Sequence, residues 1–120
     1  MVFFARSTES FKAIVVITID MKTVRFDYYV IDGLMPDLVG HDKQPSAFIV
    51  YLYLWTRIAN SRSRRVQASH QMIANDTGLS KSAVQAAVRN LLRRKLIRSE
   101  LEFKTAVPEY SVLKPWRSGK

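Results

Sequence analysis

The chain has 120 residues, 48% of them hydrophobic, which is enough for one compact domain with its own core. It contains no cysteine, which excludes disulfides, zinc fingers and thiol catalysis. The formal net charge is +9, but residues 1–45 hold five basic and six acidic residues, whereas residues 46–120 hold 14 basic and four acidic ones. The C-terminal part therefore carries +10, which indicates a polyanionic partner, either nucleic acid or an anionic membrane surface.

Neither a membrane span nor a secretory signal is expected. The longest purely apolar run near the N-terminus, Ala13–Ile17, is far shorter than the roughly 20 residues that cross a bilayer. Arg6, Glu9 and Lys12 interrupt the apolar start that a signal peptide would need. We expect a soluble, cytoplasmic protein without a membrane contact.

Residues 1–35 predict a β-rich arm. Phe11–Ile19 and Thr23–Ile31 are rich in Val, Ile, Phe and Tyr and are separated by a short polar break, which favours two strands in a hairpin. The first strand would be prone to aggregation if exposed, so we expect it to pair within the chain or with a second copy in a homodimer. The glycines and prolines around residues 36–45 predict a linker with one short helical turn.

From Pro45 onward the pattern is helical. Ser46 is a suitable N-cap for a helix that runs to about Asn60. Tyr51 and Tyr53 widen its apolar face, so the helix should be buried on most sides. The face itself would comprise Phe48, Ile49, Leu52, Trp55 and Ile58.

Two further helices are separated by a tight turn. Ser69 is a suitable N-cap for a helix over His70–Thr77, with Met72, Ile73 and Thr77 facing inward. Gly78 ends that helix, because glycine tolerates the left-handed conformation of such a turn. Ser80 caps a third helix, from Lys81 to about Lys95.

The C-terminal residues predict a β-hairpin. Leu96–Phe103 and Glu109–Leu113 have the composition of strands, and Lys104–Pro108 lies between them. The sequence thus predicts an α+β domain at residues 46–116, three helices followed by a hairpin, and a tail at residues 117–120.

The third helix has two different faces. At about 100° per residue, one side gathers apolar residues that can pack on the other helices. The opposite side combines Arg and Gln, which can bond base edges, with Ala and Ser, which are small enough for close approach. The apolar set is Val84, Ala87, Val88 and Leu91, and the opposite set is Ser82, Gln85, Ala86, Arg89 and Arg93.

The run Ser69–Leu92 resembles the helix-turn-helix of bacterial transcriptional regulators and replication initiators. The matching features are Ala74 where the two helices cross, Gly78 in the turn and Val84 packed beneath it. The following Leu91–Ile97 resembles the passage into the wing of the winged members, although many relatives have glycine where this chain has Lys95. The resemblance covers about residues 46–116 and implies a winged helix-turn-helix that binds double-stranded DNA.

The resemblance also implies roles for individual residues. Gln85 and Arg89 would contact bases, while hydroxyl and amide groups at the start of the third helix would bind phosphate. Positive side chains at the helix end, at the wing tip and in the loop before His70 would contact flanking phosphates. The expected DNA-facing residues are Ser80, Lys81, Ser82, Gln85, Ala86, Arg89, Arg93, Lys104, Arg62, Arg64 and Arg65.

Catalysis, metal binding and a cofactor have little support. His41 and His70 have no second ligand close in sequence, and the acids of residues 20–42 are interpreted as surface charge. Trp55 and Trp116 are expected to pack in the core or on the sheet.

Three functions remain open. The first is a sequence-specific transcriptional regulator, active as a homodimer in a bacterial nucleoid. The second is a plasmid- or phage-type replication initiator that uses the same domain. The third is a winged-helix module that binds another protein, for which a net charge of +10 would be unusual.

Overall fold

The computed structural model describes residues 23–101 and 107–118. The strands β1 (Val66–Gln67), β3 (Glu109–Val112) and β2 (Ile97–Glu100) form one antiparallel sheet in that order, so the predicted α+β class is confirmed. Within the two described stretches, no helix is both long and apolar enough to cross a lipid bilayer. With η marking a helix of the wider π type, the elements are η1 (Val30–Leu34), η2 (Pro36–His41), α2 (Pro45–Ala59), β1 (Val66–Gln67), α3 (His70–Thr77), α4 (Lys81–Arg93), β2 (Ile97–Glu100), β3 (Glu109–Val112) and α5 (Pro115–Ser118).

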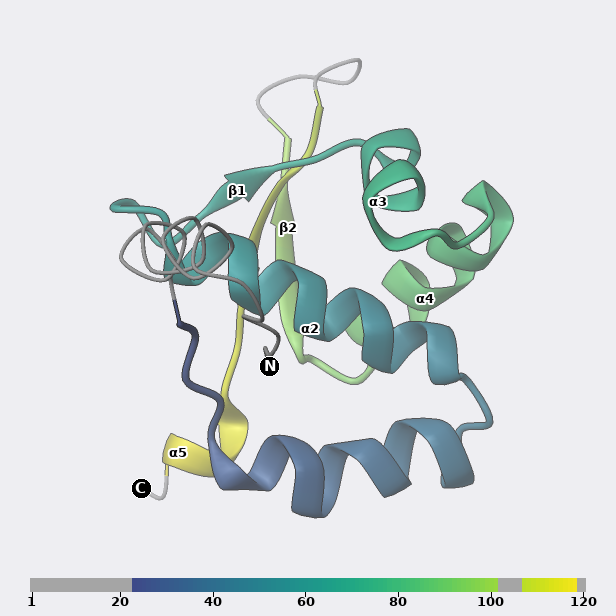
Figure 1. Cartoon of the computed structure of the whole chain (residues 1–120), viewed down its shortest axis with the longest axis vertical. Coiled ribbons are helices and arrows are strands. Elements are labelled where there is room, and N and C mark those ends of the chain that lie inside the picture. The colour runs from purple at the N-terminus through teal and green to yellow at the C-terminus, as the bar shows by residue number, and fades with distance from the viewer. Residues whose placement is uncertain (1–22, 102–106, 119–120) are drawn as a thin grey trace, which may run out of the picture.

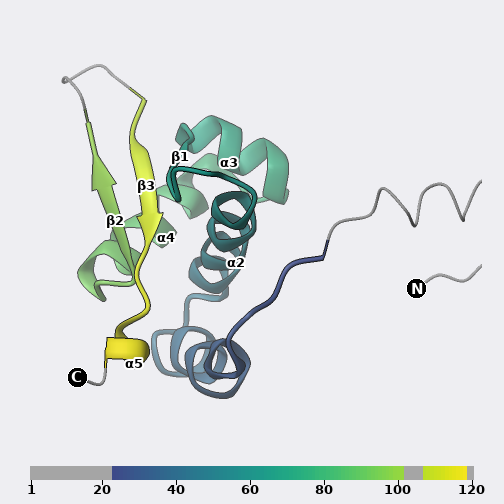
Figure 2. The same cartoon turned by 90° about the vertical axis from the view of Figure 1, so that its left-hand side faces the viewer.

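The helix α2 lies at the centre of the fold. It crosses the molecule between the η1–η2 segment on one side and α3 on the other (Figure 1). The sheet covers a further side of α2, as the turned view shows (Figure 2). Buried side chains from η1, η2, the helices α2 to α4 and the sheet form one hydrophobic core.

The η1–η2 segment differs from the prediction. Thr23–Asp27 forms neither strand nor helix and the chain is helical from residue 28, so the predicted second strand is wrong. The helical turn predicted within residues 36–45 is η2, which extends over Pro36–His41. Val30, Leu34 and Leu38 are at most 3% exposed. Their spacing of four residues places them on one side of a wide helix, whereas a strand would turn alternate residues to one side. Packing on α2 therefore overrides the strand propensity of Val, Ile and Tyr.

Residues 23–35, predicted to belong to a separate arm, pack against the predicted domain at residues 46–116. Trp55 Nε1 donates a hydrogen bond to the carbonyl oxygen of Arg25 over 2.8 Å. Trp116 Nε1 donates another to Asp27 Oδ2, also over 2.8 Å. These bonds hold the residues before η1 against α2 and α5. The predicted strand Phe11–Ile19, and the dimer contact assigned to it, lie outside the described residues.

The start of α2 also departs from the prediction. Its first residue is Pro45, and the N-cap is Gln44, which makes no side-chain capping bond, so the predicted cap at Ser46 is wrong. Proline suits the first helical position because its φ is already helical and that position needs no N–H donor. Ile49, expected to face inward, is 40% exposed. The side chains that α2 buries are Ala47, Phe48, Val50, Tyr51, Leu54 and Trp55.

The caps of α3 and α4 are as predicted. Ser69 Oγ accepts a bond from the Met72 N–H over 3.0 Å, and Ser80 Oγ accepts one from the Ala83 N–H over 3.1 Å. Gly78, between the two helices, has φ 86, which is the left-handed conformation expected of it. Met72, predicted to face the core, is instead 40% exposed.

The sheet contains one strand that the sequence did not predict. Strands β2 and β3 pair as a hairpin, with Ser99 opposite Tyr110. The short strand β1 joins the other edge of β3, with Val66 opposite Tyr110. Both strands of the hairpin are shorter than predicted, and residues 102–106, between them, lie outside the described part of the chain.

Candidate nucleic-acid interface

The helix α4 is amphipathic in the way the sequence predicts. Val84, Ala87, Val88 and Leu91 are buried. On the opposite face Ser82, Gln85, Arg89 and Arg93 are exposed and Ala86 is half-buried. The segment from Ser80 to Lys95 contains five Lys or Arg residues and no Asp or Glu. The outer face of α4 is therefore cationic and carries no negative charge of its own.

The N-terminus of α4 adds groups that favour an anion. Ser80 Oγ caps the helix and lies 3.3 Å from Ser82 Oγ. Lys81 is exposed beside them. Because the first N–H groups of a helix have no intrahelical acceptor, this end presents donors and the positive end of the helix dipole together. Ser80, Lys81 and Ser82, three of the predicted DNA-facing residues, thus lie together at the N-terminus of α4.

The N-terminus of α3 lies beside this surface. The pKa of His70, the first residue of α3, is lowered by its partial burial and by the nearby charges of Lys81 and Arg89. His70 also lines a hollow of about 480 Å³ together with Gln85 and Arg89. No local feature of the chain indicates that this histidine lies next to α4, because the contact depends on how the two helices cross.

The remaining walls of this hollow come from α4 and from the β2–β3 hairpin with its flanking residues. These walls are Val88, Leu92, Ser99, Leu101, Pro108 and Tyr110. Gln85 and Arg89 therefore lie between the N-terminus of α3 and the β2–β3 hairpin. The contribution of the hairpin could not be predicted from the α4 pattern alone.

Arg93 is exposed, but its guanidinium also makes a hydrogen bond within the protein. Its guanidinium donates to Asn90 Oδ1, and Asn90, which is 3% exposed, donates from Nδ2 to Asp42 Oδ2 over 3.0 Å. Arg93 thus belongs both to the outer face of α4 and to a polar network that reaches η2. A phosphate contact by Arg93 would have to share its guanidinium with Asn90.

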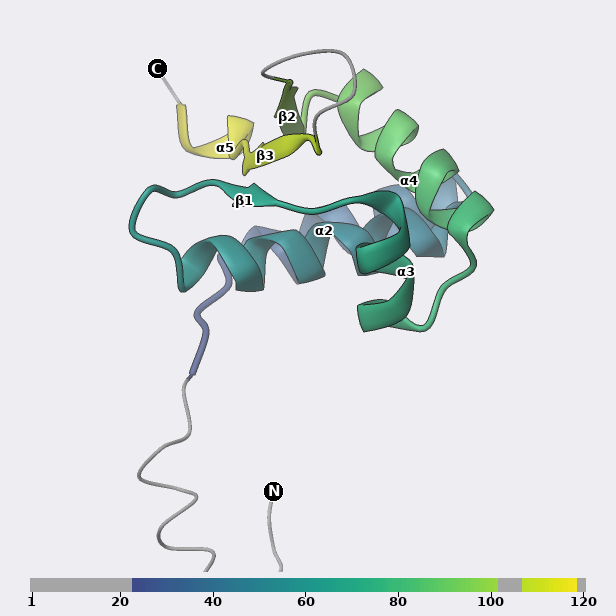
Figure 3. The same cartoon turned by 90° about the horizontal axis from the view of Figure 1, so that it is seen from above.

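The predicted cluster Arg62, Arg64 and Arg65 does not join the α4 surface. These residues precede β1, at the opposite end of α2 from α3 and α4 (Figure 3). Arg65 reaches the sheet, with its Nη1 3.5 Å from Glu109 Oε1 and 3.9 Å from Glu100 Oε1. Arg62 and Arg64 line a separate hollow. Lys104, expected at the wing tip, lies outside the described residues.

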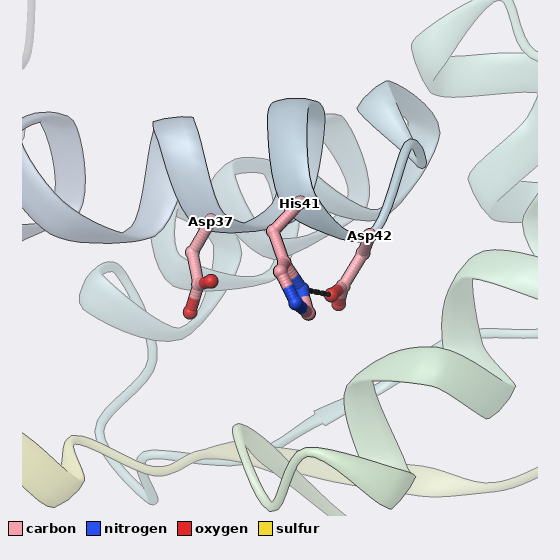
Figure 4. A group of neighbouring side chains, drawn as sticks. All are labelled: Asp37, His41 and Asp42. Atoms are coloured by element: carbon pink, nitrogen blue, oxygen red, sulfur yellow. Dashed lines mark hydrogen bonds and ion pairs between the residues drawn. The ribbon is translucent and has the colours of Figure 1, made fainter.

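Asp37, His41 and Asp42 form a group whose ligand-type atoms lie within 4.8 Å of one another (Figure 4). His41, treated as isolated in the sequence, has its Nδ1 2.9 Å from Asp42 Oδ1. The hydrogen bond with His41 is the main cause of the lowered pKa of Asp42.

Arg94 and Asn90 engage the oxygens of this group. The Arg94 guanidinium pairs with Asp37, and its Nε lies 3.2 Å from Asp42 Oδ2. A cation bound here would have to compete with Arg94. We interpret the group as an ionic contact that fixes η2 against the end of α4.

The chain was compared with known protein families, with curated proteins and with solved structures. None of the three comparisons finds a match, so the residues described above are the basis for a functional proposal.

Proposed function

We propose that this protein binds double-stranded DNA in a sequence-specific manner through the outer face of α4. The observation that carries the proposal is the exposed, acid-free face of α4, with Gln85 and Arg89 at its middle and Ser80 and Lys81 at its N-terminus. A helix of this width fits the major groove, where Arg and Gln can each make paired hydrogen bonds to a base edge.

The elements around α4 support a winged helix-turn-helix arrangement. The helix α3 is joined to α4 by a three-residue turn with the left-handed Gly78, and α4 is followed by the antiparallel hairpin β2–β3. In such an arrangement α4 enters the groove, while α3 and the hairpin contact the backbone on either side. The cationic surroundings of His70 at the start of α3 suit a phosphate at that position.

Regulation of transcription is the role that we propose for this binding. A single helix reads only a few base pairs, so two copies on adjacent half-sites would supply the required specificity. A replication initiator could use the same face, and the position of the selected sites, in a promoter or among origin repeats, distinguishes the two roles.

The proposal is tested by fluorescence anisotropy with labelled duplex DNA at several salt concentrations, followed by selection of a preferred site from a random pool. We expect binding that weakens steeply with salt. Arg89→Ala should cost about 1–3 kcal/mol on the selected site and relax its base preference.

Arg62→Ala is the matched control, since it removes the same charge at the other end of α2. It should leave affinity and base preference nearly unchanged. An Arg89→Ala variant that binds the selected duplex as tightly as the wild type would contradict the proposed role of α4.

A further inference from the structure

A second basic surface lies away from α4. It is a hollow of about 620 Å³ between the residues before η1, the C-terminal end of α2 with the loop after it, and the chain from β3 into α5. None of the residues that line it belongs to α3 or α4. Its cationic side chains are Arg25, Arg62, Arg64, Lys114 and Arg117.

The positive charge of this hollow is poorly balanced. Arg117 forms two bonds to Asp27, from Nε over 2.7 Å and from Nη2 over 2.6 Å. Among the residues that the structure describes, no carboxylate lies within ion-pair distance of Arg25, Arg62, Arg64 or Lys114. Gathering five cations near a single carboxylate, Asp27, costs free energy, and an anionic ligand would offset part of that cost.

Lys114 shows this crowding most clearly. Its pKa is lowered by burial and by the neighbouring charges of Arg117 and Arg64, and the nearby carboxylate of Asp27 offsets part of this lowering. Its Nζ lies 4.6 Å from the centre of the Trp55 ring, a contact that favours the charged ammonium. The ammonium is therefore held at the wall of the hollow beside two guanidinium groups.

The hollow also has apolar walls. Val24, Ile58 and Val112 line it together with Trp55, whose side chain is otherwise buried. A volume of this order is typical of small-ligand sites, which combine apolar walls with a few charged groups. A phosphate alone would use the cations and leave the apolar walls without a partner.

We propose that this hollow binds a small phosphate-bearing ligand of the nucleoside diphosphate class. The phosphates bind to Arg62, Arg64 and Lys114, and the ring of the ligand packs against Ile58 and Val112. Because the walls come from three parts of the chain, the bound ligand also holds the residues before η1 against the rest of the fold. This site is separate from the α4 face and does not depend on the DNA-binding proposal.

The test is a titration of the full chain with ADP, in which binding is measured by the intrinsic fluorescence of the tryptophans. Trp55 and Trp116 are the chain's two tryptophans, their rings stack 6.5 Å apart, and Trp55 lines the hollow. We expect a saturable fluorescence change with ADP and weaker binding of inorganic pyrophosphate, which lacks the ring.

The decisive variant combines Arg62→Ala with Arg64→Asn. Arg64 has φ 62, and asparagine tolerates this left-handed conformation, so the backbone of the loop is preserved. ADP affinity should fall by about tenfold or more, because two charge-assisted contacts are lost. Arg65→Ala, in the next residue but directed at Glu100 and Glu109, is the control and should change the affinity by less than about twofold.

Three results would overturn the proposal. The first is that ADP shows no saturable binding, and the second is that the double variant binds ADP like the wild type. The third is that pyrophosphate binds as tightly as ADP, which would remove the role of the ring. Loss of duplex DNA binding in the double variant, without ADP binding in the wild type, would assign the hollow to DNA phosphates instead. Arg89→Ala separates the two sites, since it should weaken DNA binding only.

Discussion

Lys95 is the residue at which the chain leaves α4 for β2, and its backbone is left-handed, with φ 59. A side chain in this conformation costs roughly 1–2 kcal/mol, whereas glycine avoids the clash at the expense of chain entropy. Lys95→Gly should therefore raise the free energy of unfolding by about 0.5–1 kcal/mol in a urea titration. Lys95→Ala keeps the β-carbon and is the control. Equal stability gains from both substitutions would show that backbone strain is not the cause.

The carboxylate of Asp27 should make a contribution to stability that depends on pH. Its hydrogen bonds from Arg117 and Trp116 lower its pKa from 3.8 to about 2. A carboxylate with a lowered pKa adds stability above its unfolded pKa, and that stability is lost as the pH falls through the folded value. Asp27→Asn should thus cost about 1–2 kcal/mol at pH 7. Denaturant titrations of both proteins should show this difference shrinking between about pH 4 and pH 2. A difference that stays constant over that range would contradict the ionic origin.

At the scale of elements, the α3–turn–α4 unit could be predicted because its signals are local. Ser69 and Ser80 cap helices with bonds to amides three residues later, and Gly78 needs no tertiary contact to favour the turn. The spacing of the apolar residues of α4 then fixes which face is buried. The outer face, and most of the proposed DNA contacts, follow from that single periodicity.

The elements that could not be predicted depend on distant partners. Strand β1 has two residues and exists because β3 offers an edge beside Val66. Thr23–Ile31, which leads into η1, is rich in strand-forming residues, yet Val30 buries completely in the shared core as part of a helix, as does Leu38 in the predicted linker. Neither result has a local signal in the sequence.

Charged residues that are neighbours in the sequence can also lie on different surfaces, which limits how far the candidate site could be predicted. Arg62, Arg64 and Arg65 are near neighbours in sequence, but Arg65 pairs with acids on the sheet while the other two line the hollow of about 620 Å³. Arg94 lies 57 positions from Asp37, and no local pattern indicates that their side chains pair. A run of like charges therefore predicts a cationic region without telling which surface each side chain joins.

For the whole molecule, the packing implies that residues 46–116 do not form a complete folding unit. Val30, Leu34 and Leu38 pack in the same core as α2, and Asp27 holds Trp116. Burial of three aliphatic side chains contributes roughly 5–8 kcal/mol, which is comparable with the total stability of a small domain.

Removal of residues 1–42 should therefore abolish cooperative thermal unfolding, as followed by circular dichroism at 222 nm. Removal of residues 1–22 is the matched control, because it keeps every described contact of the η1–η2 segment. That shorter deletion should retain a cooperative transition. If the longer deletion instead unfolds cooperatively near the temperature of the full chain, the helices α2 to α4 and the sheet are stable alone, and the η1–η2 segment is an accessory to the fold.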